Sequence, residues 1–338
     1  TVGGGQMNQA NDHGATVGGG VTNVAHADCA VVAGGNNNSA LGNDAAIGGG
    51  LTNTANGLYA VVSGGKFNGN SGLAGAVGGG ESNSVTGQYG TVAGGLENIA
   101  SDHATVVAGG HDNEANATGA AIGGGAHNIA SGADTVVGGG NTNTANGDTA
   151  TIGGGWNNTA SGQFATVAGG SYNEASGGYS TIPGGRECAA GFDFCFAAGN
   201  KAKANHKGAF VWADSNDFNY PSGGDNEFTV RATGGVHFVT AIDGSGVPTA
   251  GVEVPSGGNA WQALSLPSDV RLKEKFEPVN QEGVLEAVAT LPITEWQYKN
   301  KDKVIRHIGP MAQDFHNTFG VGESDTMISP TDTNGVAL

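Results

Sequence analysis

The sequence predicts a mainly β fold, in which a parallel β-roll of 15-residue rungs is followed by a β-rich neck and a small C-terminal α+β domain. A phrase close to Thr-Val-Gly-Gly-Gly-x-x-Asn-x-Ala recurs without insertion, and 64 of the 338 residues are glycine. The composition then changes near residues 208 and 268. We therefore expect a rod over residues 1–207, a neck over 208–267 and a separate domain over 268–338.

The repeat is built on a Val or Ile that returns every 15 residues, thirteen times from Val2 to Ile182. The β-branched pair at this point favours a short strand, because such side chains fit a pleated surface. The glycines behind it permit a corner that a residue with a Cβ resists, and an alanine eight residues on suits a narrow interior. At a strand spacing of ~4.8 Å, thirteen rungs form a rod of about 60 Å.

An asparagine follows each Val or Ile by six residues and suits a left-handed or side-chain-bridged turn. Stacked at one height, such amides can also hydrogen-bond along the rod as a ladder. The predicted ladder residues are Asn8, Asn23, Asn38, Asn53, Asn68, Asn83, Asn98, Asn113, Asn128, Asn143, Asn158 and Asn173. The thirteenth copy departs from the pattern and has Cys188.

A single rung supplies little apolar surface. One Val and one Ala cannot offset the conformational entropy that is lost when fifteen residues are ordered. We therefore expect other copies of the chain, arranged around a common axis, to supply the rest of the interior. A homotrimer is the natural closure, and a stable folded monomer in the ultracentrifuge would contradict this expectation.

The charge of the rod limits its partners. Residues 1–185 hold eleven Asp or Glu and one basic residue, Lys66, which gives −10 within a chain of net charge −17. This sign disfavours nucleic acid and anionic membrane surfaces. The sequence has no run of 18 apolar residues, so we expect no membrane insertion by this chain. We expect no cofactor, and no metal at Cys188, Cys195 and His206, which lack tetrahedral zinc spacing.

Three cysteines cannot all pair within one chain. Cys188 and Cys195 flank the end of the rod, where they form either a disulfide or two buried free thiols. Cys29 then stays free or meets a partner.

The repeats resemble the left-handed parallel β-roll of YadA-like heads, the tip modules of trimeric autotransporter adhesins that also occur in phage tail fibres. The resemblance covers residues 1–210 and rests on the asparagines in register. It implies that the roll is left-handed and trimeric.

Beyond the rod, the pattern predicts longer strands and two helices. Gly234-Gly235 predicts a hairpin between strands at 227–232 and 236–240. Asn280 is a good N-cap for a helix whose apolar face is formed by Val284, Leu285, Val288 and Leu291. Residues 293–299 and 304–308 predict a second hairpin, and Pro310 suits the first position of a helix that reaches residue 319.

One constellation could carry chemistry. Ser268-Asp269-Val270-Arg271-Leu272-Lys273 places a hydroxyl five residues before an amine. A serine needs a base to become nucleophilic, and a desolvated lysine with a lowered pKa can serve. From spacing alone, a turn serine and a surface lysine are the more ordinary explanation.

That hexapeptide, the Leu-Pro-Ile-Thr-Glu-Trp-Gln-Tyr strand and the His-Ile-Gly-Pro-Met-Ala-Gln-Asp motif resemble the endosialidase-type intramolecular chaperones. These C-terminal domains of phage tail fibres and tailspikes trimerise, assist folding and then cut themselves off. The resemblance covers about 268–338 and implies Ser268 as nucleophile and Lys273 as base for cleavage beside Ser268. Asp269 would help to define the cut. His307 heads its motif, with packing at a strand end as the alternative role.

Members of that family continue into a long helix, whereas this sequence stops at Leu338. We therefore expect the domain to be C-terminally truncated here, which leaves its cleavage activity open.

These interpretations predict an extracellular trimeric attachment fibre of a cell surface or virion, an adhesin or tail fibre without metabolic activity beyond autoproteolysis. One alternative is a glycan-degrading tailspike, but the acids that such an enzyme needs as a close pair are scattered among rungs. Another is an ice-binding β-solenoid, whose threonine column is interrupted here by Val and Ala. Aromatic residues at one rung position form either a ligand stripe or a stack, and they include Tyr59, Tyr89, Phe164 and Tyr179.

Overall fold

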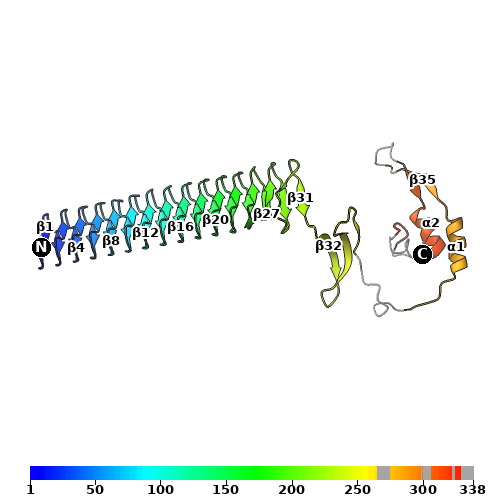
Figure 1. Ribbon diagram of the computed structural model, residues 1–338, viewed down its shortest axis with the longest axis horizontal. Helices are drawn as coiled ribbons and strands as arrows, with labels where there is room; N and C mark the ends of the chain where they lie inside the picture. The colour runs from blue at the N-terminus through cyan, green and yellow to red at the C-terminus, as the bar shows by residue number, and fades with distance from the viewer. Residues whose placement is uncertain (265–274, 298, 300–305, 322–323, 329–338) are drawn as a thin grey trace. The chain divides into compact units, whose positions relative to one another are not determined.

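The structure is a computed structural model that describes residues 1–264, 275–297, 299, 306–321 and 324–328. The chain divides into two compact units, Thr1–Ala232 and Thr233–Leu338. In the first unit it coils into a parallel β-solenoid, with two short strands in each 15-residue turn (Figure 1). The predicted mainly β fold built on a parallel roll is therefore confirmed.

Two parallel sheets run along the solenoid, one of 15 strands and one of 16. The 15-stranded sheet consists of β1 (Gln9–Ala10), β3 (Val24–Ala25), β5 (Ser39–Ala40), β7 (Thr54–Ala55), β9 (Gly69–Asn70), β11 (Ser84–Val85), β13 (Ile99–Ala100), β15 (Glu114–Ala115), β17 (Ile129–Ala130), β19 (Thr144–Ala145), β21 (Thr159–Ala160), β23 (Glu174–Ala175), β26 (Ala189–Ala190), β28 (Ala202–Ala204) and β30 (Tyr220–Pro221). The 16-stranded sheet consists of β2 (Thr16–Val17), β4 (Val31–Val32), β6 (Ala46–Ile47), β8 (Val61–Val62), β10 (Ala76–Val77), β12 (Thr91–Val92), β14 (Val106–Val107), β16 (Ala121–Ile122), β18 (Val136–Val137), β20 (Thr151–Ile152), β22 (Thr166–Val167), β24 (Thr181–Ile182), β25 (Gly185–Arg186), β27 (Phe196–Asn200), β29 (Phe210–Ala213) and β31 (Phe228–Arg231).

Each turn lies on the next in strict register. Val17 pairs with Val32 in one sheet, and Ala25 pairs with Ala40 in the other. A third line of single bridges, such as that from Val21 to Asn36, follows the 16-stranded sheet around the corner. The 15-residue period of the sequence is thus the length of one turn.

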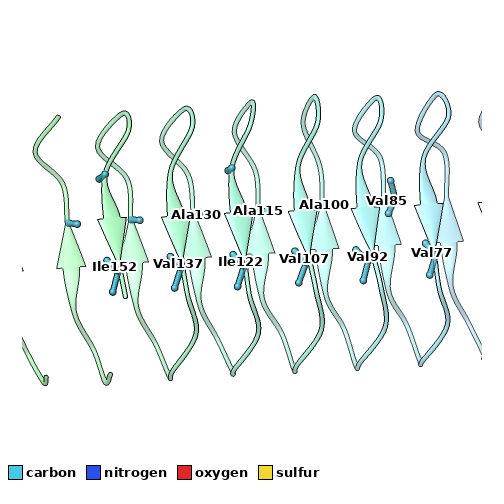
Figure 2. Close-up of a cluster of buried hydrophobic side chains, with 14 of the residues drawn as sticks. Val77, Val85, Val92, Ala100, Val107, Ala115, Ile122, Ala130, Val137 and Ile152 are labelled. Carbon is cyan, nitrogen blue, oxygen red and sulfur yellow. The ribbon is translucent and has the colours of Figure 1, made fainter. Parts of the chain in front are cut away.

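The interior is filled by a single chain, as Figure 2 shows for its central turns. Val32 of the repeat, Ala40 eight residues later and the ladder residue Asn38 are each 0% exposed, and so is Ala30. The expectation that other chains supply the interior is therefore wrong. It did not count the small residue, usually alanine, that lies two residues before each Val or Ile, and it did not count the buried asparagine as interior volume.

Large and small residues are exchanged inside the same chain. Asn70 and Val85 stand in the column that otherwise carries alanine, and Gly75 and Gly90 stand in the column opposite. A Cβ at Gly75 would lie 2.5 Å from Asn70 Oδ1 and 2.8 Å from Val85 Cγ1, and one at Gly90 would lie 3.0 Å from Val85 Cγ1. Such matched exchange indicates a closed interior.

The corners depend on left-handed residues. The last glycine of each corner has a positive φ, for example 96° at Gly95, where a Cβ would lie 2.2 Å from the carbonyl oxygen of Gly110. A second left-handed residue immediately precedes each ladder asparagine, as Phe67 with φ 58° precedes Asn68. The ladder asparagines themselves do not have positive φ values. The left-handed turn considered for them in the sequence analysis is therefore made by the residue before each asparagine, and the asparagine amide is hydrogen-bonded in the interior.

The stack continues into the segment assigned to the neck. β29 pairs in parallel with both β27 and β31, so the solenoid reaches Arg231. Phe228 stacks on Phe210 at a centroid distance of 4.8 Å. Arg231 Nε lies 2.7 Å from Asp214 Oδ1, and its guanidinium donates to the carbonyl oxygens of Phe218 and Asn216. These contacts hold β31 in the solenoid, and the hairpin predicted at Gly234-Gly235 is therefore wrong.

The second unit contains a three-stranded antiparallel sheet of β32 (Gly235–Ile242), β33 (Pro248–Pro255) and β34 (Gln262–Ala263). Its remaining elements are α1 (Gln281–Thr290), β35 (Thr294–Trp296), β36 (His307–Gly309) and α2 (Ala312–Phe319). Neither of these described helices is long and apolar enough to cross a membrane.

Local signals in this unit largely hold. The Asn280 side chain caps α1 by accepting from the Gly283 N–H at 3.1 Å, as predicted. β35 and β36 form the predicted antiparallel hairpin. The N-cap of α2 is Met311, so Pro310 precedes the cap instead of opening the helix.

Very little of the described part of the second unit is buried. Among its described side chains, Glu253 and Phe315 alone fall in the buried class. The predicted apolar face of α1 is partly open, with Leu285 71% and Val288 43% exposed, whereas Val284 and Leu291 are half-buried. The shortage of core that we expected in the rod lies here instead.

Candidate functional site

The predicted processing residues are only partly placed. Ser268, Asp269 and Lys273 lie outside the described residues. His307 begins β36 and lies opposite Trp296 of β35. Its half-buried ring stacks on the indole with centroids 4.5 Å apart. This contact is the packing role considered for His307, and a part in cleavage stays a prediction.

The hairpin around His307 carries a polar surface hollow. Glu295, Trp296, Gln297 and Arg306 line it, with a volume of about 540 Å³. Arg306 and Glu295 form an ion pair across the two strands. The hollow therefore has a paired charge and an indole edge, and among the described residues it holds no nucleophile.

Comparison with known proteins identifies this region. Residues 268–320 match the family described as the chaperone of endosialidase. The chain carries a chaperone of endosialidase domain. The matched range contains Ser268, Lys273 and His307. No curated protein matches the chain.

The position of the chaperone of endosialidase domain behind a long solenoid defines the architecture. A parallel β-solenoid followed by this domain is the organisation of a tail-fibre-like protein, and it indicates a virion or extracellular setting.

The asparagine column forms a continuous hydrogen-bonded ladder. Asn38 Nδ2 donates to Asn23 Oδ1 at 3.1 Å, to the Gly34 carbonyl at 3.1 Å and to the Gly50 carbonyl at 3.0 Å. From Asn23 to Asn173, each backbone N–H donates to Oδ1 of the asparagine one turn earlier. Because these amides are buried and engaged within the rod, the column is structural and offers nothing to a ligand.

Cys188 ends the ladder. Its backbone N–H donates to Asn173 Oδ1 at 2.9 Å, and its Sγ lies 3.2 Å from the Gly199 carbonyl oxygen. Cys195 occupies the interior column that lies two residues before the repeat Val or Ile, and its Sγ donates to the His206 carbonyl at 3.0 Å. Both are buried free thiols, so the structure has no disulfide between them. The two side chains belong to different interior columns, each with its own acceptor.

The C-terminal part of the aromatic column is a stack. Phe164, Tyr179 and Phe194 lie on successive turns with ring centroids 4.9 and 5.4 Å apart and interplanar angles of 19° and 13°. The Lys207 ammonium lies 5.8 Å from the Phe194 ring centroid, over its outer face. Neighbouring rings therefore cover the faces that a ligand would use, which favours stacking over a ligand stripe. Tyr89 instead contacts His103 edge to face.

The structure reveals an acid–histidine edge that the sequence analysis missed. Glu97 and Asp112 occupy the same position on consecutive turns, and His111 and His127 lie beside them. His127 Nδ1 is 2.8 Å from Asp112 Oδ2, and the two imidazoles are 5.2 Å apart. The 15-residue offset between the two acids could have revealed this pair. Within the described residues, no His, Cys, Asp and Glu cluster has the arrangement of a metal site.

A second missed contact joins His206 Nδ1 to Ser222 Oγ at 2.8 Å. The pair has the composition of a hydrolytic dyad, but Ser222 is only 5% exposed and already accepts from the Asn205 N–H at 3.0 Å. The amides of Gly223 and Gly224, which could hold an oxyanion, donate to Glu227 Oε2. The pair therefore fastens the last turn of the solenoid.

Proposed function

We propose that the chain is a subunit of an extracellular, homotrimeric attachment fibre of the tail-fibre type. In this proposal the C-terminal domain directs assembly and then cuts itself off beside Ser268. The observation that carries the proposal is the chaperone of endosialidase domain at residues 268–320, which follows a long solenoid in the same chain.

The exposed apolar side chains of the second unit support the assembly step. Ile308 is 74% exposed, Trp261 57% and Phe238 52%. Burial of a large apolar side chain stabilises a fold by roughly 1.5–3 kcal/mol, and the described part of this unit gains little of that by itself. Three copies that cover one another's side chains would supply the missing core.

The repeat explains why such a fibre needs a terminal clamp. Within one chain, strands pair 15 residues apart, so the turns form from nearby sequence. Between chains, nearly identical turns offer many equivalent registers, each shifted by one turn. A trimerising domain at one end would fix the register before the rods meet, and cleavage afterwards would leave a kinetically trapped trimer.

The cleavage step needs only this chain and water. The Lys273 amine accepts the hydroxyl proton of Ser268, and Oγ adds to the carbonyl carbon of Pro267. The C–N bond to Ser268 breaks as its nitrogen takes the proton, which leaves an ester between Pro267 and Oγ. Water then hydrolyses the ester and restores the hydroxyl.

Expression of the wild-type chain beside Ser268→Ala tests the proposal. We expect fragments 1–267 and 268–338 from the wild type and one intact chain from the variant, identified by intact mass. Ser324→Ala, a serine elsewhere in the same unit, is the control and should cleave. Light scattering on the same samples measures the mass, and a wild-type monomer would contradict the fibre proposal whether or not cleavage occurs.

A further inference from the structure

The outward side of the 16-stranded sheet and the glycine corner that follows it form an uncharged strip along the whole rod. It consists of three columns: the residue before each repeat Val or Ile, and the two residues after it. The first column holds Thr, Val or Ala on every turn up to Thr181, the second holds Gly, Ala, Ser or Pro, and the third holds Gly throughout. The first-column valines are 38–43% exposed, as at Val31 and Val136. We call these columns the uncharged face.

All the charge of the rod lies elsewhere. None of the eleven acidic residues in 1–185, and not Lys66, belongs to the uncharged face. Glu114 and Glu174 lie on the outward side of the other sheet. Lys66 and Glu81 pair at 2.8 Å along the line of single bridges. An acidic rod can thus meet a second acidic rod along this one side without bringing carboxylates together.

The uncharged face changes character where the solenoid ends. Its first column continues as Phe196, Phe210 and Phe228, whose rings stack at 4.5 and 4.8 Å. Trp212, which follows the interior Val211 on the same strand, is 39% exposed. The strip therefore carries only small side chains along the rod and large aromatic side chains at its C-terminal end. That end is the one followed in the chain by the proposed trimerising domain.

We propose that the uncharged face is the surface along which copies of this chain pack, parallel and in register. This inference rests on the trimer of the proposed function and names the side that faces the common axis. The small first-column residues and the glycines let two flat sheets approach to about the 10 Å of packed sheets. In register, the Phe196, Phe210 and Phe228 stacks of the copies meet one another.

The size of the strip suits this role. Thirteen turns at ~4.8 Å and three residues of ~3.3 Å give roughly 60 by 10 Å, or about 600 Å² for each chain. A standard interface buries about 800 Å² on each partner. The strip together with its aromatic end therefore approaches the area of a specific contact.

Matched cysteine variants test the inference on the full chain. Thr91→Cys lies on the uncharged face, one residue before interior Val92, and Ser84→Cys is its counterpart on the other sheet, one residue before interior Val85. Both are made in a Cys29→Ser background, because Cys29 is the exposed native thiol. A short bis-maleimide is added, and covalent species are counted by denaturing electrophoresis and mass.

We expect Thr91→Cys to give covalent dimers at least ten times more efficiently than Ser84→Cys, since an axis brings equivalent residues of the copies together. A trimeric wild type in which Ser84→Cys cross-links as well as Thr91→Cys would overturn the assigned face and leave the trimer intact. A monomeric wild type would overturn both proposals. Thermal hysteresis that disappears in Ala76→Glu would assign the face to ice and also overturn the inference.

Discussion

The exchange of residues between two interior columns allows a quantitative test of the closed solenoid. Val85 occupies an alanine position, and its Cγ1 would lie 3.0 Å from a Cβ at Gly90. Gly90→Ala therefore forces one methyl group too many into a packed interior, at a cost of about 1–3 kcal/mol. Its φ lies outside the left-handed region, so part of that cost, ~0.4–1 kcal/mol, is returned through the unfolded chain.

Val85→Ala has the opposite effect to Gly90→Ala, because it leaves the interior underpacked. It removes two methyl groups from a side chain that is 0% exposed, which costs about 2 kcal/mol in transfer and cavity terms. The double variant restores the alanine pair that most turns carry. We expect it to be more stable than the sum of the two single changes by ~1–3 kcal/mol.

The assay is urea and thermal unfolding of the full-length chain, followed by far-UV circular dichroism at fixed protein concentration. Gly69→Ala is the control: a Cβ there would meet nothing within 4 Å, so this variant should show only the ~0.4–1 kcal/mol of stabilisation that comes from the unfolded chain. Strictly additive single variants, with no coupling between Val85 and Gly90, would show that the two columns do not face each other in one interior.

Two further predictions concern the buried polar groups of the rod. Asn113→Ala removes an amide that bonds to both neighbouring turns, leaves buried N–H and C=O groups unpaired and should destabilise the chain by about 3–5 kcal/mol in the same unfolding assay. Asn56→Ala, at an exposed position, should be neutral. Cys29 alone should react with a thiol reagent in the native chain, because Cys188 and Cys195 are buried and burial raises the pKa of the Cys188 thiol. In denaturant without reductant all three should react, whereas a single reactive thiol there would reveal a disulfide.

The sequence alone was sufficient for the solenoid because the repeat acts at every level. A β-branched residue, a glycine corner and an asparagine recur at one spacing, so strand, turn and ladder positions all follow from the period. What it could not settle was how many chains close the interior. Val32 and Ala40 were counted as core, but the buried amide of Asn38 was read mainly as a turn former.

The end of the solenoid was misjudged for a different reason. The period contracts at Phe210 and then expands, so Phe228–Arg231 no longer looks like a rung. Only long-range contacts, from Arg231 to Asp214 and from Phe228 to Phe210, hold it there. The sequence around each of these residues gives no signal of such long-range contacts. The same holds for the contact between His206 and Ser222.

The strict 15-residue period places every side chain in either an inward or an outward column of the solenoid. Inward columns must stay small and satisfied on every turn, so Val, Ala and Asn vary little there and carry no information about partners. Outward columns are free to vary, and on most of them Lys, Glu, Asp, His and aromatic residues do. The uncharged face is outward and yet carries no charge on any of its turns. The corner geometry accounts for its glycines, since Gly49 has a φ of 151° and a Cβ at Gly48 would lie 2.3 Å from the Ser63 carbonyl oxygen. Solvent alone does not require the first column to stay uncharged, whereas a packed neighbour does, which is why the contact between copies belongs on this side of the rod.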